Sequence, residues 1–331
     1  AKNVEAVDEV GPGDIVGLIG PHQTVTGDTL CAVNKPLFLE KISFPEPVIA
    51  IAIEPKSAKD KDRLTEALTL LCREDPTLEL QKNETGQLLL AGMGELHLEI
   101  NTNRLRDEFK LQARFGKPRV AFRETLTAAA AITGTFNRII GDKTLYAEVD
   151  IDFIPDLRPG GNRIENHVRA SLPHNWIDGA IVTLENALKT GGHYGYPLIQ
   201  VRAVIKDIRG ATEKTTDSAV CAAVMQAVSE AIRQGTNVLE PLMQLDIIAP
   251  EENIGEITGY LQARRAVITH ISTLGGVKHL NCNVPMAEMF GFSKALPQLS
   301  GGRASCSMEP CGYQVISGAD LQRMIDASAT F

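Results

Sequence analysis

The sequence contains no apolar run approaching the roughly 20 residues that a membrane helix needs, so we expect no contact with a membrane. Its first residues show neither an initiator methionine nor the charged-then-apolar pattern of a secretion signal. We therefore expect a cytoplasmic fragment of a longer protein, with further domains preceding it. Hydrophobic residues make up 44% of the chain and charged residues 22%, which is ordinary for a soluble globular protein. A length of 331 residues predicts two to four domains of roughly 100–150 residues each.

Cysteine pairs of the C-x-x-C type are also missing. The six cysteines are scattered along the chain, and nothing in the sequence indicates passage through an oxidising compartment. We therefore expect reduced thiols, with no structural zinc and no disulfide bonds. The cysteines are Cys31, Cys72, Cys221, Cys282, Cys306 and Cys311.

Signatures of catalytic sites are missing as well. There is no G-x-x-x-x-G-K-S/T phosphate-binding loop, no H-E-x-x-H and no G-x-S-x-G. Glu95, His97 and Glu99 come close together, but their spacing does not place the three side chains on one face of a helix. We expect these residues to begin a helix with polar side chains outward. The chain alone should therefore hydrolyse no nucleotide and hold no metal or cofactor.

A formal net charge of -8 excludes a protein coated uniformly in nucleic acid, because phosphate binding needs clustered lysine and arginine. Local basic tips are still compatible with this charge. Arg264 and Arg265 close a predicted helix, where the helix dipole favours cations; contact with RNA phosphates is the alternative. Tyr194 and Tyr196 are either an RNA-stacking pair or, as we favour, a strand entry packed on a core.

Two parts of the sequence repeat one plan. Each begins with Glu-Pro, at 46–47 and 240–241, followed by an apolar run that stops at a proline before a helical pattern. Two strands, a second helix and a last strand complete a β-α-β-β-α-β order, the ferredoxin-like motif. We place these units at 44–118 and 237–331 and call them the first unit and the last unit. The first predicted helix carries Leu64, Ala67, Leu68 and Leu71 inward, and a C-terminal helix is predicted after Ser317, with Leu321, Met324 and Ile325 inward.

A different α/β domain, called the middle domain below, is predicted between the two units at 119–236. Ahead of everything, residues 1–36 carry short apolar stretches and tight turns, which predict the end of a β-barrel. The whole chain is therefore predicted to be a multidomain α+β protein. The strands of the middle domain are predicted near 146–153 and 198–208, and its helices near 176–190 and 216–234.

Several motifs, in order along the chain, resemble translation elongation factor G. The run from Val284 to Phe292, continued to Met308, is similar to the last domain of that factor. The run from Gly92 to Ile100 resembles its third domain, and Arg123-Glu124-Thr125 resembles the junction into its fourth. Gly13-Asp14-Ile15 is similar to the close of its second domain. The chain is therefore identified as a C-terminal fragment of a divergent paralogue in this family.

The resemblance has concrete implications for fold and function. It implies two ferredoxin-like domains, III and V, around a domain IV like domain 2 of ribosomal protein S5, after a remnant of the β-barrel domain II. The parent would be a ribosome-dependent GTPase that binds GTP and Mg²⁺ outside this chain. Domain IV would reach tRNA and mRNA at the decoding region, and domain V would approach ribosomal RNA and ribosomal proteins. The protein would act as a monomer.

The two tip loops of domain IV correspond in this resemblance to residues 138–148 and 207–219. Only one glycine of the family's doublet remains in the first loop, and Lys214 stands where the family has a histidine in the second. A lysine can meet phosphate as a point charge, but it lacks the donor and acceptor of a neutral imidazole. These departures suggest specialisation, for example toward ribosome recycling. The implied RNA-facing residues are Arg138, Ile140, Gly141, Asp142, Lys143, Arg209, Gly210, Glu213 and Lys214 at the tip, with Arg264 and Arg265 in domain V.

Three other interpretations stay open. A ribosomal protection protein of the tetracycline-resistance type shares the domain layout, although the ending after Gly312-Tyr313 favours the elongation-factor branch. A small-molecule kinase could share the pattern of the middle domain, but the phosphate loop that it needs is missing. A ligand-sensing protein with ferredoxin-like regulatory domains would bind a small molecule and no ribosome.

Overall fold

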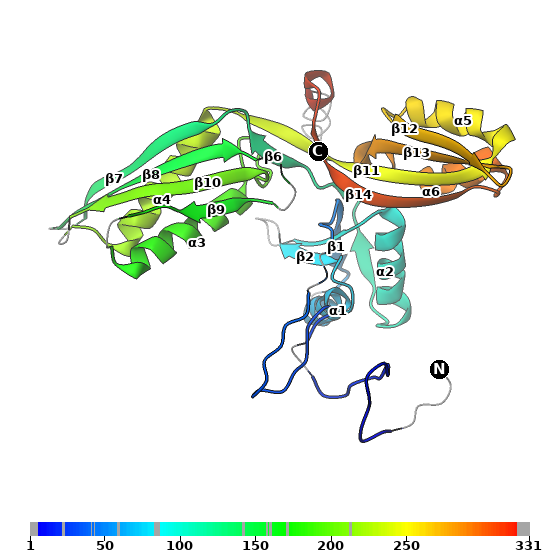
Figure 1. Cartoon of the computed structure of the whole chain (residues 1–331), viewed down its shortest axis with the longest axis horizontal. Helices are drawn as coiled ribbons and strands as arrows, with labels where there is room; N and C mark the ends of the chain where they lie inside the picture. The colour runs from blue at the N-terminus through cyan, green and yellow to red at the C-terminus, as the bar shows by residue number, and fades with distance from the viewer. Residues whose placement is uncertain are drawn as a thin grey trace.

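The computed structural model describes residues 6–21, 24–40, 42, 44–57, 60–82, 87–140, 143–156, 158, 161–169, 172–211 and 214–322. Its strands form three sheets, each packed against helices. The middle domain and the last unit extend to opposite sides, and the first unit lies below the junction between them (Figure 1). The mixed α+β, multidomain fold predicted from the sequence is confirmed. Within the described residues, no helix combines the length and the apolar character needed to cross a membrane.

The first unit has the predicted β-α-β-β-α-β order. It consists of β1 (Ile49–Pro55), α1 (Lys61–Glu74), β2 (Glu79–Lys82), β3 (Leu88–Gly92), α2 (Glu95–Asp107) and β4 (Ala113–Phe115). The strands form a sheet in the order β2-β3-β1-β4. Alternation along β1 buries Ile49, Ile51 and Ile53, as expected for a strand with one face on a core. Helix α1 buries the face predicted for it: Leu64, Ala67, Leu68 and Leu71.

The last unit repeats this arrangement. It consists of β11 (Thr236–Pro250), α5 (Glu251–Gln262), β12 (Val267–Leu274), β13 (Val277–Pro285), the short 3-10 helix η2 (Met286–Glu288), α6 (Phe292–Ser300) and β14 (Ser305–Val315). The sheet order is β12-β13-β11-β14. The predicted turn into the last strand is present, because Gly301 and Gly302 both have a positive φ, of 58° and 75°. The predicted helix after Ser317 begins as expected, with the Asp320 N–H donating to the Ser317 hydroxyl, and its positions 324 and 325 lie outside the described residues.

The middle domain consists of β7 (Ala130–Ile140), β8 (Lys143–Pro155), β9 (Arg163–Asn166), α3 (His174–Thr190), β10 (Val201–Gly210) and α4 (Asp217–Arg233). The sheet order is β7-β8-β10-β9, and only β9 and β10 are parallel neighbours. Alternate residues of β8, including Val149, Ile151 and Phe153, are buried with α3 and α4 in a core separate from the one that the first and last units share. Both predicted helices are confirmed.

Two short strands tie the entry of the middle domain to the other sheets. Strand β5 (Arg119–Val120) pairs with β1 of the first unit. Strand β6 (Arg123–Leu126) pairs with the first residues of β11, the 15-residue strand that continues into the last unit. Figure 1 shows β11 running across the junction between the middle domain and the last unit. The middle domain is therefore connected to the last unit by hydrogen-bonded strands as well as by chain continuity.

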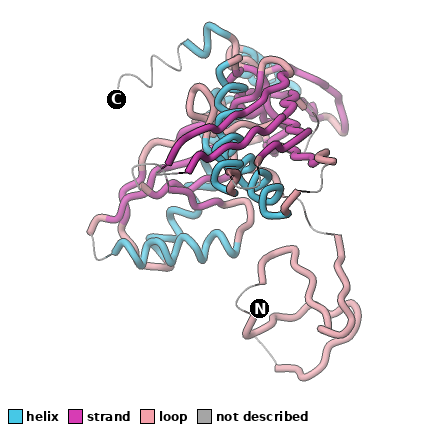
Figure 2. Tube along the Cα trace, turned by 90° about the vertical axis from the view of Figure 1, so that its left-hand side faces the viewer, coloured by secondary structure: helices cyan, strands magenta, loops and turns pink. Residues whose placement is uncertain are grey.

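The β-barrel strands expected within residues 1–36 are absent from the described part of this segment. The described residues from 6 to 40 contain turns and extended chain but no strand, and they lie as an open loop apart from the packed elements (Figure 2). The predicted tight turns are present, for example where the Asp14 N–H donates to the Gly11 carbonyl. Ile15 and Ile19 are fully exposed. A strand needs a neighbouring strand for its backbone hydrogen bonds, and no described residue pairs with this segment.

Candidate nucleic-acid interface

The two tip loops predicted from the sequence lie side by side at the far end of the middle domain. Strands β8 and β10 pair up to Ala147 and Gly210, so their loops leave the sheet at the same edge. The Tyr146 N–H donates to the Lys214 carbonyl over 2.9 Å, and the Thr215 hydroxyl donates to the Tyr146 carbonyl over 2.5 Å. Ile140 and Lys143 are the last backbone pair of the β7–β8 hairpin. Gly141, Asp142 and Glu213 lie outside the described residues.

Gly210 shapes the second loop. A Cβ at this position would lie 2.7 Å from the Cγ2 of Thr215 and closer still to its hydroxyl oxygen. Thr215 is only 8% exposed, and its hydroxyl also accepts the Ala211 N–H over 2.9 Å. The next residue, Thr216, caps α4 by accepting the Ala219 N–H. Gly210 therefore allows the close turn that holds Lys214 at the tip.

Arg209 is paired within the sheet. Its guanidinium donates to Glu148 over 3.0 Å and to the Asp150 Oδ1 over 3.0 Å, and it lies 3.3 Å from Asp207. The hydrogen bonds from Arg209 are the largest effect on Asp150 and hold the pKa of that carboxyl below its usual value. The sequence does not reveal this cluster, because Glu148 and Asp150 come from the neighbouring strand β8. The Arg209 charge is thus neutralised locally, and contact of this residue with RNA stays a prediction.

Arg138 and Lys214 are two exposed cations of the tip. Arg138 lies on β7 with its guanidinium 5.9 Å from the Phe136 ring centroid, within reach of a cation–π contact. Neither Arg138 nor Lys214 forms an ion pair with any residue that the structure describes. Their positive charges are therefore available to an anionic partner.

The predicted pair in the last unit separates into two environments. The Arg264 guanidinium lies 3.7 Å from the Tyr260 ring centroid. Arg265 has a φ of 59° and donates to both oxygens of Glu240, over 2.7 and 3.0 Å, and to Glu288 over 2.9 Å. Burial lowers the pKa of Arg265, but these hydrogen bonds outweigh it and raise the pKa above its ordinary value. Arg265 therefore holds the fold of the last unit together, a role that its sequence position did not indicate.

His97 also has a structural role. The Met93 N–H donates to Nδ1 over 3.1 Å, so Nε2 carries the proton that it shares with the Asp75 carboxylate over 2.8 Å. Its neighbour Glu95 was expected to point outward, but its carboxylate accepts the Gly291 N–H over 2.9 Å and links α2 to the last unit. No three metal-ligating side chains converge anywhere in the described ranges. Glu95 and His97 therefore anchor α2 through different partners, and Glu99 is exposed.

Replacing Asp75 with alanine should destabilise the first unit by about 1 kcal/mol at neutral pH. Burial raises the pKa of Asp75, but hydrogen bonds from Thr77 and His97 lower it by more. The pKa of Asp75 is therefore below its ordinary value of 3.8. A carboxylate with a lowered pKa stabilises the fold above its unfolded pKa, and this contribution disappears as the pH falls through the folded value. Thermal unfolding should therefore show that the difference in stability between the original sequence and Asp75→Ala disappears below about pH 4. A difference in stability that stays constant from pH 7 to pH 3 would contradict this.

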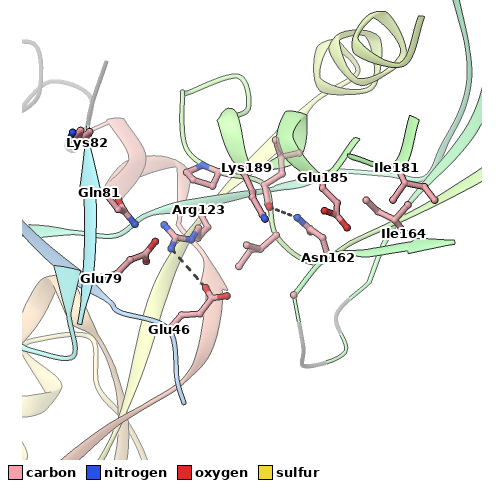
Figure 3. Close-up of a pocket in the computed structure, with 14 residues that line it drawn as sticks. Glu46, Glu79, Gln81, Lys82, Arg123, Asn162, Ile164, Ile181, Glu185 and Lys189 are labelled. Carbon is pink, nitrogen blue, oxygen red and sulfur yellow. Dashed lines mark hydrogen bonds and ion pairs between the residues drawn. The ribbon is translucent and has the colours of Figure 1, made fainter. Parts of the chain in front are cut away.

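A cavity of about 720 Å³ lies between the first unit and the middle domain (Figure 3). Its walls carry charges of both signs, including Lys82 and Glu79 from β2 and Lys189 and Glu185 from α3. The Arg123 guanidinium lies 3.9 Å from the Glu46 carboxylate at one side of the cavity. None of these side chains forms a nucleophile–base pair, and the mixed charge favours no single class of ligand. The cavity separates the two domains and does not resemble a catalytic pocket.

Comparison with known protein families gives consecutive matches along the chain. The model of elongation factor G domain III matches residues 44–117, that of domain IV matches 118–236, and that of the elongation factor G C-terminus matches 237–324. The chain belongs to the elongation factor G family. The boundaries between the three matches fall next to β5 and within the first residues of β11, where the sheets are joined.

Curated proteins named elongation factor G agree with this assignment. Those of two strains of Dehalococcoides mccartyi are 37% identical over 331 residues, covering 99% of this chain and 48% of each relative. The chain thus spans about half the length of the curated relatives that it matches. A crystal structure of a Thermus thermophilus protein superposes with a TM-score of 0.68 and 30% identity, over 88% of this chain and 44% of that one. The family resemblance therefore extends through all three packed units.

Proposed function

We propose that this chain is the ribosome-binding arm of an elongation factor G-like translational GTPase. The consecutive matches to elongation factor G domain III, domain IV and C-terminus carry the proposal. In this proposal GTP and Mg²⁺ are bound, and GTP is hydrolysed, by parts of the parent protein outside this chain. The parent works in the cytoplasm as a monomer. The domains of the parent that this chain contains are residues 1–36, 44–118, 119–236 and 237–331.

The tip of the middle domain is the proposed contact with tRNA and mRNA at the decoding region. Two loops meet there, and they present Arg138 and Lys214 without carboxylate partners among the described residues. Lysine and arginine supply the phosphate contacts that position a protein on RNA. The last unit approaches ribosomal RNA with Arg264 in the same proposal, while the Arg265 guanidinium is engaged with Glu240.

The reaction promoted by the parent is translocation of tRNA and mRNA or recycling of the ribosome. Lys214 in place of the family's histidine supports a divergent paralogue, because an ammonium donates hydrogen bonds and accepts none. Translocation and subunit-splitting assays of the parent protein, run side by side, distinguish the two tasks. Normal single-turnover translocation that is lost in Lys214→Ala would argue against specialisation away from translocation.

Sedimentation of the chain with purified ribosomes tests the proposal. We expect the chain to sediment with ribosomes at low salt and to be released as salt rises, because phosphate contacts exchange with counterions. Absence from the ribosome pellet at every salt concentration would remove the proposal. That result would favour the ligand-sensing interpretation of the ferredoxin-like units instead.

A further inference from the structure

Glu124 is a fully buried carboxylate without a cationic partner. It lies in β6 with 0% of its surface exposed, and it forms no ion pair within the described ranges. Its Oε1 accepts the N–H groups of Tyr194, over 2.9 Å, and Tyr196, over 3.0 Å. Its Oε2 accepts the Thr236 hydroxyl over 2.5 Å. Three neutral donors therefore hold one buried charge.

The turn at 191–196 is shaped around this carboxylate. A Cβ on Gly192 would lie 2.6 Å from the Glu124 carboxyl carbon, and closer still to Oε2. The backbone adds two hydrogen bonds, from the Glu124 N–H to the Pro197 carbonyl over 2.9 Å and from the Ile199 N–H to the Glu124 carbonyl over 2.8 Å. The rings of Tyr194 and Tyr196 have different partners, His193 and Phe122 respectively. The glycines and tyrosines of this segment thus enclose Glu124 at the base of the middle domain, the end opposite the tip loops.

The third donor comes from the strand that leads out of the middle domain. Thr236 is the first residue of β11, which pairs with β6 from Thr236 opposite Leu126 to Leu239 opposite Arg123. From there β11 continues between β13 and β14 in the sheet of the last unit. One carboxylate therefore joins β6, the turn that follows α3 and the strand that leads into the last unit.

A buried charge held by neutral donors is costly unless every hydrogen bond is made in the correct direction. An apolar side chain would fill the same volume without that cost, so the carboxylate is a demanding way to fill space. Its hydrogen bonds are directional and join β6 and the turn after α3 to the first residue of β11, the strand that continues into the last unit. We propose that Glu124 is a positioning residue, which fixes the direction of the middle domain relative to the last unit.

The geometry makes that direction important at the tip. Strand β8 has 13 residues and runs from the base of the middle domain to the tip hairpin, a length of about 40 Å. A tilt of about 10° at the base would displace the tip by about 7 Å, more than the length of a hydrogen bond. Loss of the Glu124 contacts would therefore spread the tip over a range of positions even though each domain keeps its fold.

The spread can be measured in the free chain, without ribosomes. Met225 on α4 and Lys294 on α6 are exposed and lie on either side of the junction. Donor and acceptor fluorophores attached through azide-bearing amino acids at these positions report the distance distribution between the middle domain and the last unit. We expect a narrow distribution in the parent sequence. Glu124→Ala and Thr236→Val should each at least double its width.

Conservative variants provide the matched controls. Glu124→Gln keeps an oxygen for the two backbone N–H groups, and its amide can donate to a reoriented Thr236 hydroxyl. Thr236→Ser keeps the hydroxyl itself. Both should retain the narrow distribution. The single tryptophan, Trp176, packs against the core of the middle domain, so its fluorescence reports whether that domain stays folded in every variant.

An unchanged width in Thr236→Val, with the middle domain folded, would overturn the proposal, and so would a broad distribution in Glu124→Gln. If Glu124→Ala unfolds the domain, Thr236→Val still decides, because it removes only the bond to β11. This proposal concerns the direction of the middle domain and not the partner that it binds. Failure of the chain to bind ribosomes would leave this proposal unaffected. An unchanged distance distribution in Thr236→Val would overturn this proposal and leave the proposed function unaffected.

Discussion

Gly134→Ala should destabilise the middle domain by about 3 kcal/mol or more, at the upper end of the range for overpacked cores. Gly134 lies on β7 against α4, where a Cβ would lie 2.8 Å from the Ala227 Cβ and closer still to the Ala223 carbonyl oxygen. The atoms in the way belong to a helix backbone and a short side chain, which cannot rotate aside. Thermal or denaturant unfolding followed by Trp176 fluorescence measures the loss in the middle domain itself.

Gly179→Ala is the matched control, because it makes the same change in the same domain. Gly179 lies within α3, and its Cβ would meet only the Cys221 sulfur at 3.5 Å, an ordinary contact. Alanine is favoured over glycine inside a helix by about 1 kcal/mol, so this variant should be as stable as the parent sequence or slightly more so. Equal stability of the two variants would show that the close approach of β7 and α4 is not as tight as described.

Substitution of both Arg138 and Lys214 by alanine should weaken ribosome binding by roughly tenfold or more at moderate salt. Each lost phosphate contact lowers the slope of log affinity against log salt by about 1, so the double variant should lose about 2. These are the exposed tip cations for which the structure shows no ion pair among the described residues. Sedimentation with ribosomes over a series of salt concentrations gives both quantities.

The exchange Arg138→Lys with Lys214→Arg provides the control, because it keeps both charges and changes only their shape. It should keep the salt slope of the parent sequence. A double alanine variant with the same slope as the parent would place the RNA contacts elsewhere on the chain. Arg209 would not be the next residue to replace in a search for those contacts, because its removal would leave Glu148 and Asp150 without their hydrogen-bond partner.

The repeated fold could be predicted because its signal is periodic and local. The inward face of α1, with Leu64, Ala67, Leu68 and Leu71, follows from helical spacing alone, and it is the buried face of that helix. The strand predicted near 146–153 and the apolar run after Pro241 correspond to β8 and β11, along which buried residues alternate. The prediction of N-terminal strands was wrong, because short apolar stretches form a strand only where another strand is available to pair with them.

The roles of single polar residues were much harder to predict. Arg265 resembles an ordinary helix-end cation, and its partners Glu240 and Glu288 become neighbours only in the folded chain. The role of Glu95 was equally hard to predict, because its partner is the Gly291 N–H on a different unit. Glu124 is a charged residue, and charged residues are ordinarily expected at the surface. The sequence indicates its buried position only indirectly, because the turn that encloses it contains glycines at 191, 192 and 195, before Pro197.

A cryo-electron microscopy map of the chain bound to ribosomes tests the central proposal most directly. We expect the tip carrying Arg138 and Lys214 to lie at the decoding region of the small subunit, with the last unit against ribosomal RNA. A chain bound with its tip directed into solvent, or one that leaves no density on the ribosome at low salt, would contradict the account.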